Sequence, residues 1–525
     1  MSADARPHDP LMTDTALPRR FPSVVHALLD AARRAPSATA LICGDESLTY
    51  HDYARSVATL ARTLSRWGAR GSRIALLMGN SIDIAIASFA VQAAGMQLVP
   101  LNPGYTIHEL GPILDNAEPL GLIHDADCPA TVVDLARARG LRTLAAAAPG
   151  YRLTALQAAD ASPEEPLLEL PDPESLSTLQ YTGGTTGRAK GVNLTHHAVS
   201  INVSQREALL PTRTEAERVL AVTPLFHVYA VAMGLYLAVF CRGTLVILPR
   251  YRPDWVFDAI EHHRITVFSG SPTLFTGLMA HERFARAKLD SLRLCYSGAA
   301  ALPVSTLERW ERETGCPIVE GYGQSEAGPV LSYNPVDGVR KPGSVGIALP
   351  LTEIQIVDTD TGTRVLPKGQ SGEIRARGPQ IMQGYRGLEA ETRAALREGW
   401  LHTGDIGEFD QDGYLFIRDR KKDMVIVGGF NVYPREVEEA LLTHPSVLEA
   451  AVVGIPDSYR GEALVAFVVG RSATPDPDTI IAHLEQRLVR YKVPAHIRIV
   501  DALPRTAVGK TDKPALRILA AESAA

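Results

Sequence analysis

The clearest chemical signal in the sequence is a loop rich in glycine and threonine, running from Tyr181 to Val192. Glycines let backbone N–H groups turn toward one point, the threonines add hydroxyl donors, and Lys190 adds a positive charge. A plain flexible hairpin would need neither the lysine nor the threonines, and the loop lacks the Walker spacing. We therefore predict a loop that binds nucleotide phosphates, formed by Thr182, Gly183, Gly184, Thr185, Thr186, Gly187 and Lys190.

Four further motifs carry residue types suited to nucleotide chemistry. Small residues stand at Gly298-Ala299-Ala300, and Gly321-Tyr322-Gly323-Gln324-Ser325-Glu326 combines an aromatic ring, a hydroxyl and a carboxylate. A second carboxylate ends Trp400-Leu-His-Thr-Gly-Asp405, and a lysine ends Pro504-Arg-Thr-Ala-Val-Gly-Lys510. Taken singly, a turn after a strand, a surface glutamate and an exposed lysine are ordinary features of any protein. Their specificity lies in their occurring together.

Alternating elements must position these motifs. From about residue 21 to 420, short Val/Ile/Leu runs alternate with Ala/Leu-rich amphipathic stretches, a pattern typical of helices that cover mostly parallel sheets. The pattern predicts a strand at Ile74–Met78, a helix at Ile82–Ala94 and a strand at Leu292–Ser297 that stops at Gly298. We expect an α/β fold with a large N-terminal domain of βα-repeat sheets over residues 21–420, preceded by a flexible tail at 1–20.

The character of the sequence changes near residue 420. The charged run Arg418–Asp423 is followed by an apolar stretch and by the pair Gly428-Gly429. Pro434 then marks the first turn of a helix, and strands are predicted at Leu448–Val453 and Ala463–Val469. Residues 421–525 therefore predict a small α+β domain, within the usual size of a domain.

Composition excludes several classes of function. The chain has 525 residues and a net charge of -6 with no long basic run, which argues against nucleic-acid binding. Its five cysteines are widely spaced, so neither a disulfide framework nor a zinc site is indicated, and a cytoplasmic location is expected. The apolar stretch Val219–Cys241 contains Pro224 and His227, so a buried helix is favoured over a transmembrane segment, which takes about 20 apolar residues.

The motifs, taken in order, resemble those of the adenylate-forming enzymes, the superfamily of acyl-CoA synthetases, luciferases and carrier-protein adenylation domains. The likeness runs from about residue 21 to 518 and is closest to bacterial fatty-acid CoA ligases. One departure is Ser325, where the family more often has threonine, and it keeps the hydroxyl. The resemblance implies that the small C-terminal domain is mobile, with a hinge at Lys422.

The resemblance also implies roles for individual residues. Gly298, Ala299 and Ala300 would border the adenine edge, and the Gly321–Ser325 segment would bind AMP through the Tyr322 ring and the Ser325 hydroxyl. Glu326 would hold Mg²⁺, which prefers hard oxygen ligands. The other implied positions are Asp405 for the ribose, Arg420 for the nucleotide, His227 and Tyr229 for the acyl pocket, and Gly428 and Gly429 for the tunnel that admits CoA.

Lys510 would be the mobile lysine that bridges the carboxylate and the nucleotide, since a cation there stabilises negative groups brought together in the transition state. Lys510, Glu326 and His227 are thus the predicted catalytic residues, although a satisfied core histidine competes as an account of His227. No arranged nucleophile motif is visible in the sequence, which agrees with catalysis by positioning and charge neutralisation.

We therefore expect an enzyme that uses ATP, Mg²⁺ and coenzyme A to convert a medium- or long-chain fatty acid to its acyl-CoA thioester through an acyl-adenylate. Its partners would be the small-molecule carboxylic acid, ATP and CoA, with a homodimer and a loose membrane association left open. Three alternatives remain: an aromatic acid CoA ligase, an enzyme that loads a carrier-protein thiol, and a catalytically silent module that binds acyl-nucleotides.

Overall fold

The computed structural model describes residues 17–146, 169–182, 189–427, 430–457, 460–471, 475–506 and 510–522. They form two compact units: the first contains the chain up to Ile354 and Ala376–Leu401, and the second contains Gln355–Arg375 and the chain from His402 onward. The predicted phosphate-loop residues 183–187 and the pair Gly428-Gly429 lie outside the described residues. The predicted boundary between residues 420 and 421, which falls within the second unit, stays a prediction.

The larger sheet of the first unit is mostly parallel. Strands β1, β10, β9, β11, β12 and β13 run parallel in that spatial order, and antiparallel strands close both edges. The nine strands lie in the order β15 (Ile347–Ala348), β14 (Val330–Tyr333), β13 (Ile318–Gly323), β12 (Leu294–Ser297), β11 (Val267–Gly270), β9 (Arg218–Ala221), β10 (Thr244–Ile247), β1 (Thr39–Cys43) and β2 (Glu46–Thr49).

The second sheet of this unit carries the strands that flank the predicted phosphate loop. Strands β7, β4, β3, β5 and β6 run parallel, whereas β8 is antiparallel to both β7 and β18. The seven strands lie in the order β18 (Gly384–Tyr385), β8 (Lys190–Thr195), β7 (Leu176–Thr182), β4 (Gln97–Leu101), β3 (Arg73–Leu77), β5 (Gly121–Asp125) and β6 (Arg142–Ala146).

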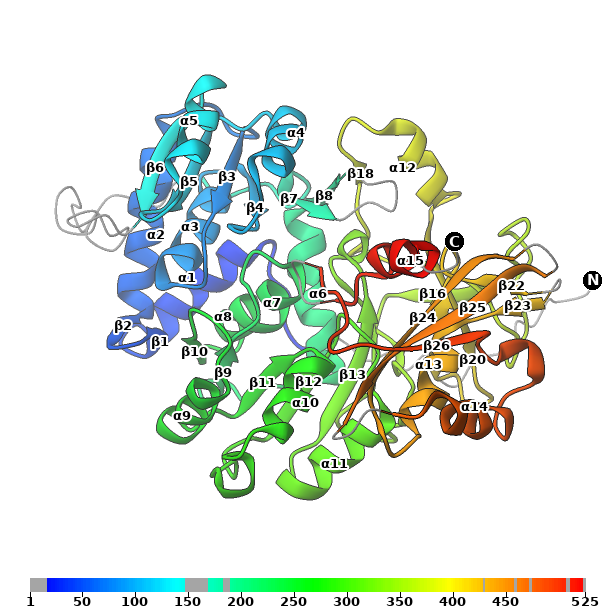
Figure 1. Ribbon diagram of the computed structural model, residues 1–525. Coiled ribbons are helices and arrows are strands. Elements are labelled where there is room, and N and C mark those ends of the chain that lie inside the picture. Colours follow the sequence, from blue (N-terminus) through cyan, green and yellow to red (C-terminus); the bar gives the residue numbers. More distant parts are fainter. Residues whose placement is uncertain are drawn as a thin grey trace, which may run out of the picture. The chain divides into compact units, whose positions relative to one another are not determined.

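Helices connect and cover these strands, as the βα pattern predicts (Figure 1). The predicted helix at Ile82–Ala94 is confirmed as α3 (Ile82–Ala93), in which every residue is buried, as expected for a helix that is apolar on most sides; its three polar residues, Asp83, Ser88 and Gln92, are buried as well. Among the described residues of the first unit, the other helices of eight residues or more are α1 (Val24–Arg34), α2 (Tyr50–Ser65), α4 (Ile107–Ala117), α5 (Ala130–Ala138), α6 (His196–Leu209), α9 (Pro253–His263), α10 (Pro272–Ala280) and α11 (Val304–Thr314).

The apolar stretch Val219–Cys241 begins with the end of strand β9, and its unbroken part from Val228 onward is confirmed as a buried helix. It comprises α7 (Val228–Ala230), the π-helical turn η2 (Val231–Tyr236) and α8 (Leu237–Phe240), and the side chains from Val231 to Phe240 are all buried. Within the described residues, no helix combines the length and the apolar content that crossing a membrane requires.

Helix α6 is the element that connects the two sheets of the first unit. Thr195 caps its N-terminus by accepting a hydrogen bond from the Ala198 N–H at 3.0 Å. The helix contacts β7 and β8 of one sheet and β14 of the other, so that few of its side chains reach solvent. It is nevertheless rich in polar residues that are buried: His196, Ser200, Asn202, Ser204, Gln205, Arg206 and Glu207.

Two amides on α6 show how this polar surface is satisfied. The Asn202 side chain donates to the Val330 carbonyl at 2.9 Å and accepts from the Val330 N–H at 3.1 Å. One turn on, the Gln205 amide donates to the Pro350 carbonyl at 2.8 Å and to the Thr352 hydroxyl at 3.2 Å. Because buried polar groups are costly when unpaired, these bonds fix the helix against β14 and the turn that follows β15.

The second unit contains the predicted α+β arrangement. Its sheet has the order β23 (Phe430–Val432), β22 (Val425–Val427), β25 (Gly461–Gly470) and β24 (Val447–Asp457), and β26 (His496–Ile499) also pairs with β25. Alternate residues of β25 enter two apolar cores, one under α13 (Pro434–Leu442) and α14 (Pro477–Glu485) and the other under α15 (Lys513–Glu522).

A further five-stranded sheet carries the remaining site segments. It consists of β16 (Glu353–Val357), β17 (Gly372–Arg377), β20 (Trp400–Phe409), β19 (Leu396–Arg397) and β21 (Leu415–Arg420), with β21 antiparallel to β20. The described chain also has the helix α12 (Glu389–Ala395) and three 3₁₀ turns, η3 (Phe284–Arg286), η4 (Ser325–Ala327) and η5 (Arg490–Lys492).

The buried amide of Gln205 generates a stability prediction. Replacing Gln205 with Met keeps the volume but leaves the Pro350 carbonyl without this donor, so we expect the free energy of unfolding to fall by about 1–3 kcal/mol. Urea denaturation of the variant beside Gln383→Met, a matched change at an exposed glutamine, provides the measurement. Equal stability of the two variants would contradict the importance assigned to this bond.

Candidate active site

Two predicted nucleotide segments leave adjacent parallel strands at the same edge of the nine-stranded sheet. Strands β12 and β13 pair through Ser297 and Glu320, so Gly298–Ala300 and Gly321–Gly323 follow directly after paired residues. Carboxyl ends of neighbouring parallel strands are where such sheets bind ligands. The structure therefore brings together the predicted adenine-edge residues and the predicted aromatic motif.

Close packing explains the glycines in these segments. A Cβ on Gly298 would lie 2.7 Å from the ring of Tyr229, and a Cβ on Gly323 would lie 1.9 Å from the Pro329 carbonyl oxygen. Tyr229, predicted to line the acyl pocket, is thus buried directly against the predicted adenine-edge segment. Ala299 adopts a φ of 68°, a left-handed conformation that is uncommon for a residue with a side chain.

The strands on either side of the predicted phosphate loop hold its first and last polar residues together. Strands β7 and β8 pair so that Thr182 lies opposite Lys190. The Lys190 ammonium lies 5.1 Å from the centre of the Tyr385 ring on β18, the neighbouring strand, within the range of a cation–π contact. Lys190 is thereby held beside Tyr385.

Glu326 belongs to the same cluster and comes from the segment that follows β13 of the nine-stranded sheet. It lies in the 3₁₀ turn η4, and its carboxylate accepts a hydrogen bond from the Tyr385 hydroxyl at 2.9 Å. Burial, followed by the charge of Glu326 and this hydrogen bond, raises the pKa of Tyr385, which therefore stays a protonated donor. The backbone is fixed as well, because the Met382 N–H donates to the Glu326 carbonyl at 2.9 Å.

Sequence analysis did not single out Tyr385. The residue belongs to a two-residue strand whose partner, Val192, lies far away along the chain, and no local pattern marks it. The only available signal was its aromatic type among mixed polar and apolar neighbours, which is too common to be informative. Its role emerges from strand pairing, which places its ring beside Lys190 and its hydroxyl on Glu326.

His227 occupies the N-terminus of α7, next to the segment that follows β9. Its Nδ1 accepts a hydrogen bond from the Tyr229 N–H at 3.3 Å, and the preceding carbonyl, of Phe226, accepts one from the Gln180 amide on β7 at 3.3 Å. His227 is half-buried, unlike Tyr229. The helix start is thus tied to the strand that leads into the predicted phosphate loop.

In the second unit, the structure pairs the predicted ribose ligand with the predicted nucleotide arginine. Asp405 on β20 lies opposite Arg420 on β21, and the Arg420 Nε lies 3.3 Å from an Asp405 carboxylate oxygen. Asp405 is buried, whereas the Arg420 side chain is half exposed. Lys422 follows two residues later in the turn closed by the hydrogen bond from the Asp423 N–H to the Arg420 carbonyl.

Lys510 lies elsewhere in the second unit, where its backbone bonds to Thr506. Its N–H donates to the Thr506 hydroxyl at 3.2 Å, the Thr506 N–H donates to its carbonyl at 2.7 Å, and the flanking residues Arg505 and Thr511 form a β-bridge. Arg505 also pairs with Glu449 on β24 at 2.6 Å. The residues that flank Lys510 are thereby attached to the sheet.

The first-unit cluster offers a set of groups suited to a phosphate bound with a cation. Lys190 supplies positive charge, and Glu326 supplies the hard carboxylate oxygen that Mg²⁺ accepts when it shares its coordination with substrate phosphates. No group of three or more His, Cys, Asp or Glu able to hold a metal ion occurs among the described residues.

Curated relatives cover almost the whole chain. It is 38% identical over 516 residues to a long-chain-fatty-acid–CoA ligase of Bacillus subtilis (strain 168), covering 92% of each chain. It is also 38% identical over 490 residues to a feruloyl-CoA synthase of an Amycolatopsis species, covering 93% of this chain and 96% of the relative.

Among solved structures, ATP-bound MatB from Rhodopseudomonas palustris superposes with a TM-score of 0.88 at 32% identity, covering 95% of this chain and 98% of that one. The family model of the AMP-binding enzyme matches residues 28–386, and the model of the AMP-binding enzyme C-terminal domain matches residues 436–510. The resemblance inferred from the motifs is confirmed, and the chain belongs to the family of AMP-binding enzymes.

Proposed function

We propose that the protein is an AMP-forming ligase that activates a fatty acid with ATP and transfers the acyl group to coenzyme A. The observation that carries the proposal is the cluster of Lys190, Tyr385 and Glu326, which gathers a cation and a hard carboxylate ligand beside the strand ends of an AMP-binding enzyme. Curated relatives named as long-chain-fatty-acid–CoA ligases support the choice of acid.

The chemistry has two steps, because a carboxylate is a poor electrophile until its oxygen becomes part of a good leaving group. In the first, a carboxylate oxygen bonds to the α-phosphorus of ATP and pyrophosphate departs. In the second, the thiol sulfur of CoA bonds to the acyl carbon, its proton is lost, and AMP departs. Catalysis then consists mainly of positioning the reactants and stabilising the developing charge.

Residues of the first unit would bind the nucleotide in both steps. Lys190 and the hydroxyl of Thr182 would contact phosphate oxygens, and Ser325 would lie at the α-phosphate beside Glu326. Mg²⁺, held by Glu326, would neutralise charge on the phosphates. Tyr385 would orient the Glu326 carboxylate through the hydrogen bond of 2.9 Å.

Residues of the second unit would bind the ribose and would serve the two steps one after the other. Asp405 would accept hydrogen bonds from the ribose hydroxyls, with Arg420 holding the carboxylate in place at 3.3 Å. Lys510 would serve adenylation, and rotation at Lys422 would then replace it by the Gly428-Gly429 segment for thioester formation. A hinge motion of this kind commonly gates turnover.

Aromatic acids are the second candidate substrates. The observation that favours them is the feruloyl-CoA synthase, which is as similar to this chain as the Bacillus ligase is. Both candidates share the nucleotide chemistry and differ only in the acid, so an assay of the acid distinguishes them.

A panel of carboxylic acids tests the proposal. With ATP, Mg²⁺ and CoA present, we expect CoA-dependent AMP formation to be fastest with a medium- or long-chain fatty acid and much slower with ferulate or cinnamate. A preference for the aromatic acids would select the second candidate. Pyrophosphate release without any CoA-dependent product would indicate a different acceptor, and no release at all would contradict the proposal.

The lysine that we assign to adenylation provides a test of the two-step scheme. Lys510→Ala should slow acyl-adenylate formation by about a hundredfold or more, since it removes one preorganised stabilising charge. The same variant should convert supplied acyl-adenylate and CoA to thioester at nearly the normal rate. Lys368→Ala, a change at an exposed lysine of the same unit, is the matched control. Equal losses in both steps would contradict the role.

The Glu326 carboxylate and the Tyr385 hydroxyl should differ in their effects. Glu326→Gln removes the charge that would hold Mg²⁺, so we expect adenylation to need about ten- to a hundredfold more Mg²⁺, as loss of a charged contact of about 1.5–3 kcal/mol would require. Tyr385→Phe, which removes only the orienting hydrogen bond, should shift the Mg²⁺ requirement less. A Mg²⁺ titration that is unchanged in Glu326→Gln would contradict the assignment.

A further inference from the structure

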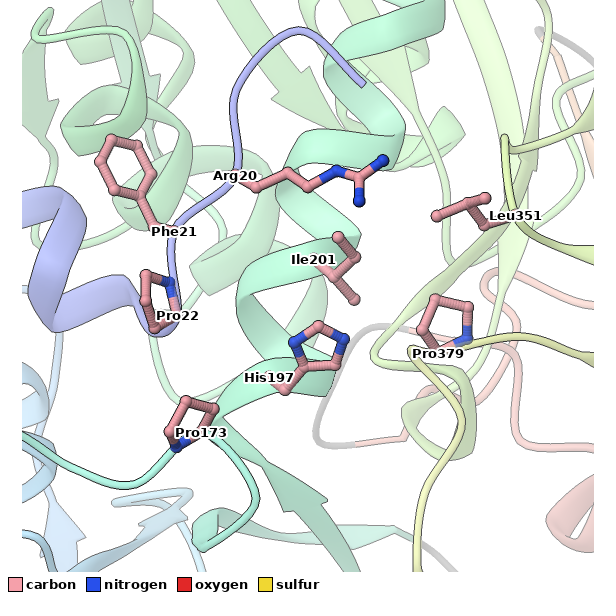
Figure 2. Close-up of a pocket in the computed structure, with 8 residues that line it drawn as sticks. All are labelled: Arg20, Phe21, Pro22, Pro173, His197, Ile201, Leu351 and Pro379. Atoms are coloured by element: carbon pink, nitrogen blue, oxygen red, sulfur yellow. The ribbon is translucent and has the colours of Figure 1, made fainter. Parts of the chain in front are cut away.

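The first unit carries a pocket that shares no residue with the candidate active site. It has a volume of about 390 Å³ and lies between the segment before α1, the first turns of α6 and the segments around residues 351 and 379 (Figure 2). Its lining is mostly apolar, and its two polar side chains belong to Arg20 and His197. Pockets of this volume, apolar with a few polar groups, are typical of sites for small ligands.

One wall of this pocket is a turn that has an unusual residue at its third position. Residues 349–352 form a turn closed by the hydrogen bond from the Thr352 N–H to the Leu349 carbonyl at 3.0 Å, with Pro350 in the second position. The third position, Leu351, has a φ of 63°, a conformation for which such turns select glycine or asparagine. Its side chain is 57% exposed, so burial in the core does not explain it.

The turn is held firmly enough to maintain this conformation. The Gln205 amide on α6 donates to the Pro350 carbonyl at 2.8 Å, which anchors the turn beside the helix. In Figure 2, Leu351 lies across from the Arg20 guanidinium, and Ile201 of α6 lies between the Arg20 and His197 side chains. A leucine that does not suit its backbone and is largely exposed to water is suited to contact an apolar ligand in this pocket.

The opposite wall supplies a positive charge. Arg20 belongs to a segment that is fixed on both sides: the Arg19 guanidinium donates to the Phe240 carbonyl at 3.3 Å, and the Phe21 carbonyl accepts from the Ser200 hydroxyl of α6 at 2.8 Å. Arg20 itself is exposed, and within the described chain its guanidinium has no hydrogen-bond or ion-pair partner. In Figure 2 it points into the space opposite Leu351.

We infer that this pocket is a second, non-catalytic binding site for an amphiphilic carboxylate, a free medium-chain fatty acid, whose head group pairs with Arg20 and whose chain lies on Ile201 and Leu351. The choice of a fatty acid rests on the proposed function, which makes such acids ligands of this chain. Charge complementarity sets the orientation, since Arg20 is the one permanent cation of the pocket lining and every other lining side chain except the His197 imidazole is apolar.

The pocket is also connected to the active-site cluster. Pro379, which lines it, precedes Gln380, whose amide donates to the Thr352 hydroxyl at 2.6 Å and to the Val330 carbonyl at 3.3 Å. Two residues further, the Met382 N–H donates to the Glu326 carbonyl. A ligand in the pocket therefore contacts the segment that supports the predicted magnesium ligand.

Binding of decanoate to the full-length protein tests the inference. The active site is first filled with a non-reactive acyl-adenylate mimic, such as an acyl sulfamate of adenosine, and decanoate binding is then measured by isothermal titration calorimetry. We expect one molecule to bind per chain. Arg20→Glu and Leu351→Gly should each weaken this binding about tenfold or more, whereas Arg66→Glu, at another exposed arginine of the first unit, should leave it unchanged.

Leu351→Gly is informative because it supplies the residue that the turn prefers, so its melting temperature should equal or exceed that of the normal protein while decanoate binding falls. If decanoate does not bind to the protein filled with the mimic, or if all variants bind it equally, the inference is overturned. Binding of anionic phospholipid vesicles, but not of decanoate, that is lost in Arg20→Glu would overturn it in favour of a membrane contact. AMP formation from decanoate, assayed separately without the mimic, shows whether the proposed function fails instead.

Discussion

The first unit depends on the burial of a polar helix. Helix α6 lies between two sheets and presents amides, hydroxyls and an arginine–glutamate pair to its neighbours, so its position is set by directional bonds. The two hydrogen bonds between Asn202 and Val330 define the register of the helix against β14. Apolar side chains alone would tolerate small shifts, whereas each displaced amide would leave a buried partner unpaired.

The position of α6 matters because the predicted nucleotide-binding segments are connected to it from both sheets. Strand β14 pairs with β13, which ends at the Gly321–Gly323 motif, and β8 leads from Lys190 directly into the helix. Fixing α6 therefore fixes the distance between the strand ends of one sheet and the phosphate-loop strands of the other. Tyr385 contacts both groups, with its ring beside Lys190 and its hydroxyl on Glu326.

The sequence predicted much of this architecture and a smaller part of the site. Helix α3 and strand β12 follow from runs of apolar residues, and the predicted motifs include Lys190 and Glu326, whose elements the structure brings together through Tyr385. Helix α6 lacks such a signal, because bonds that position it, such as those of Asn202 and Gln205, are made to segments far away in the chain. Tyr385 is missed for the same reason: its partners are defined by strand pairing and have no local pattern.

Departures from local rules are informative in this chain when they have no local explanation. Glu118 and Arg264 adopt positive φ values at the ends of α4 and α9, where a left-handed residue closes the helix. Ala299 and Leu351 share the positive φ but close no helix, and both are apolar. Ala299 lies in the predicted adenine-edge segment, and Leu351 lies in the proposed fatty-acid pocket. Since strained positions persist where surroundings impose them, the same physical criterion marks both sites.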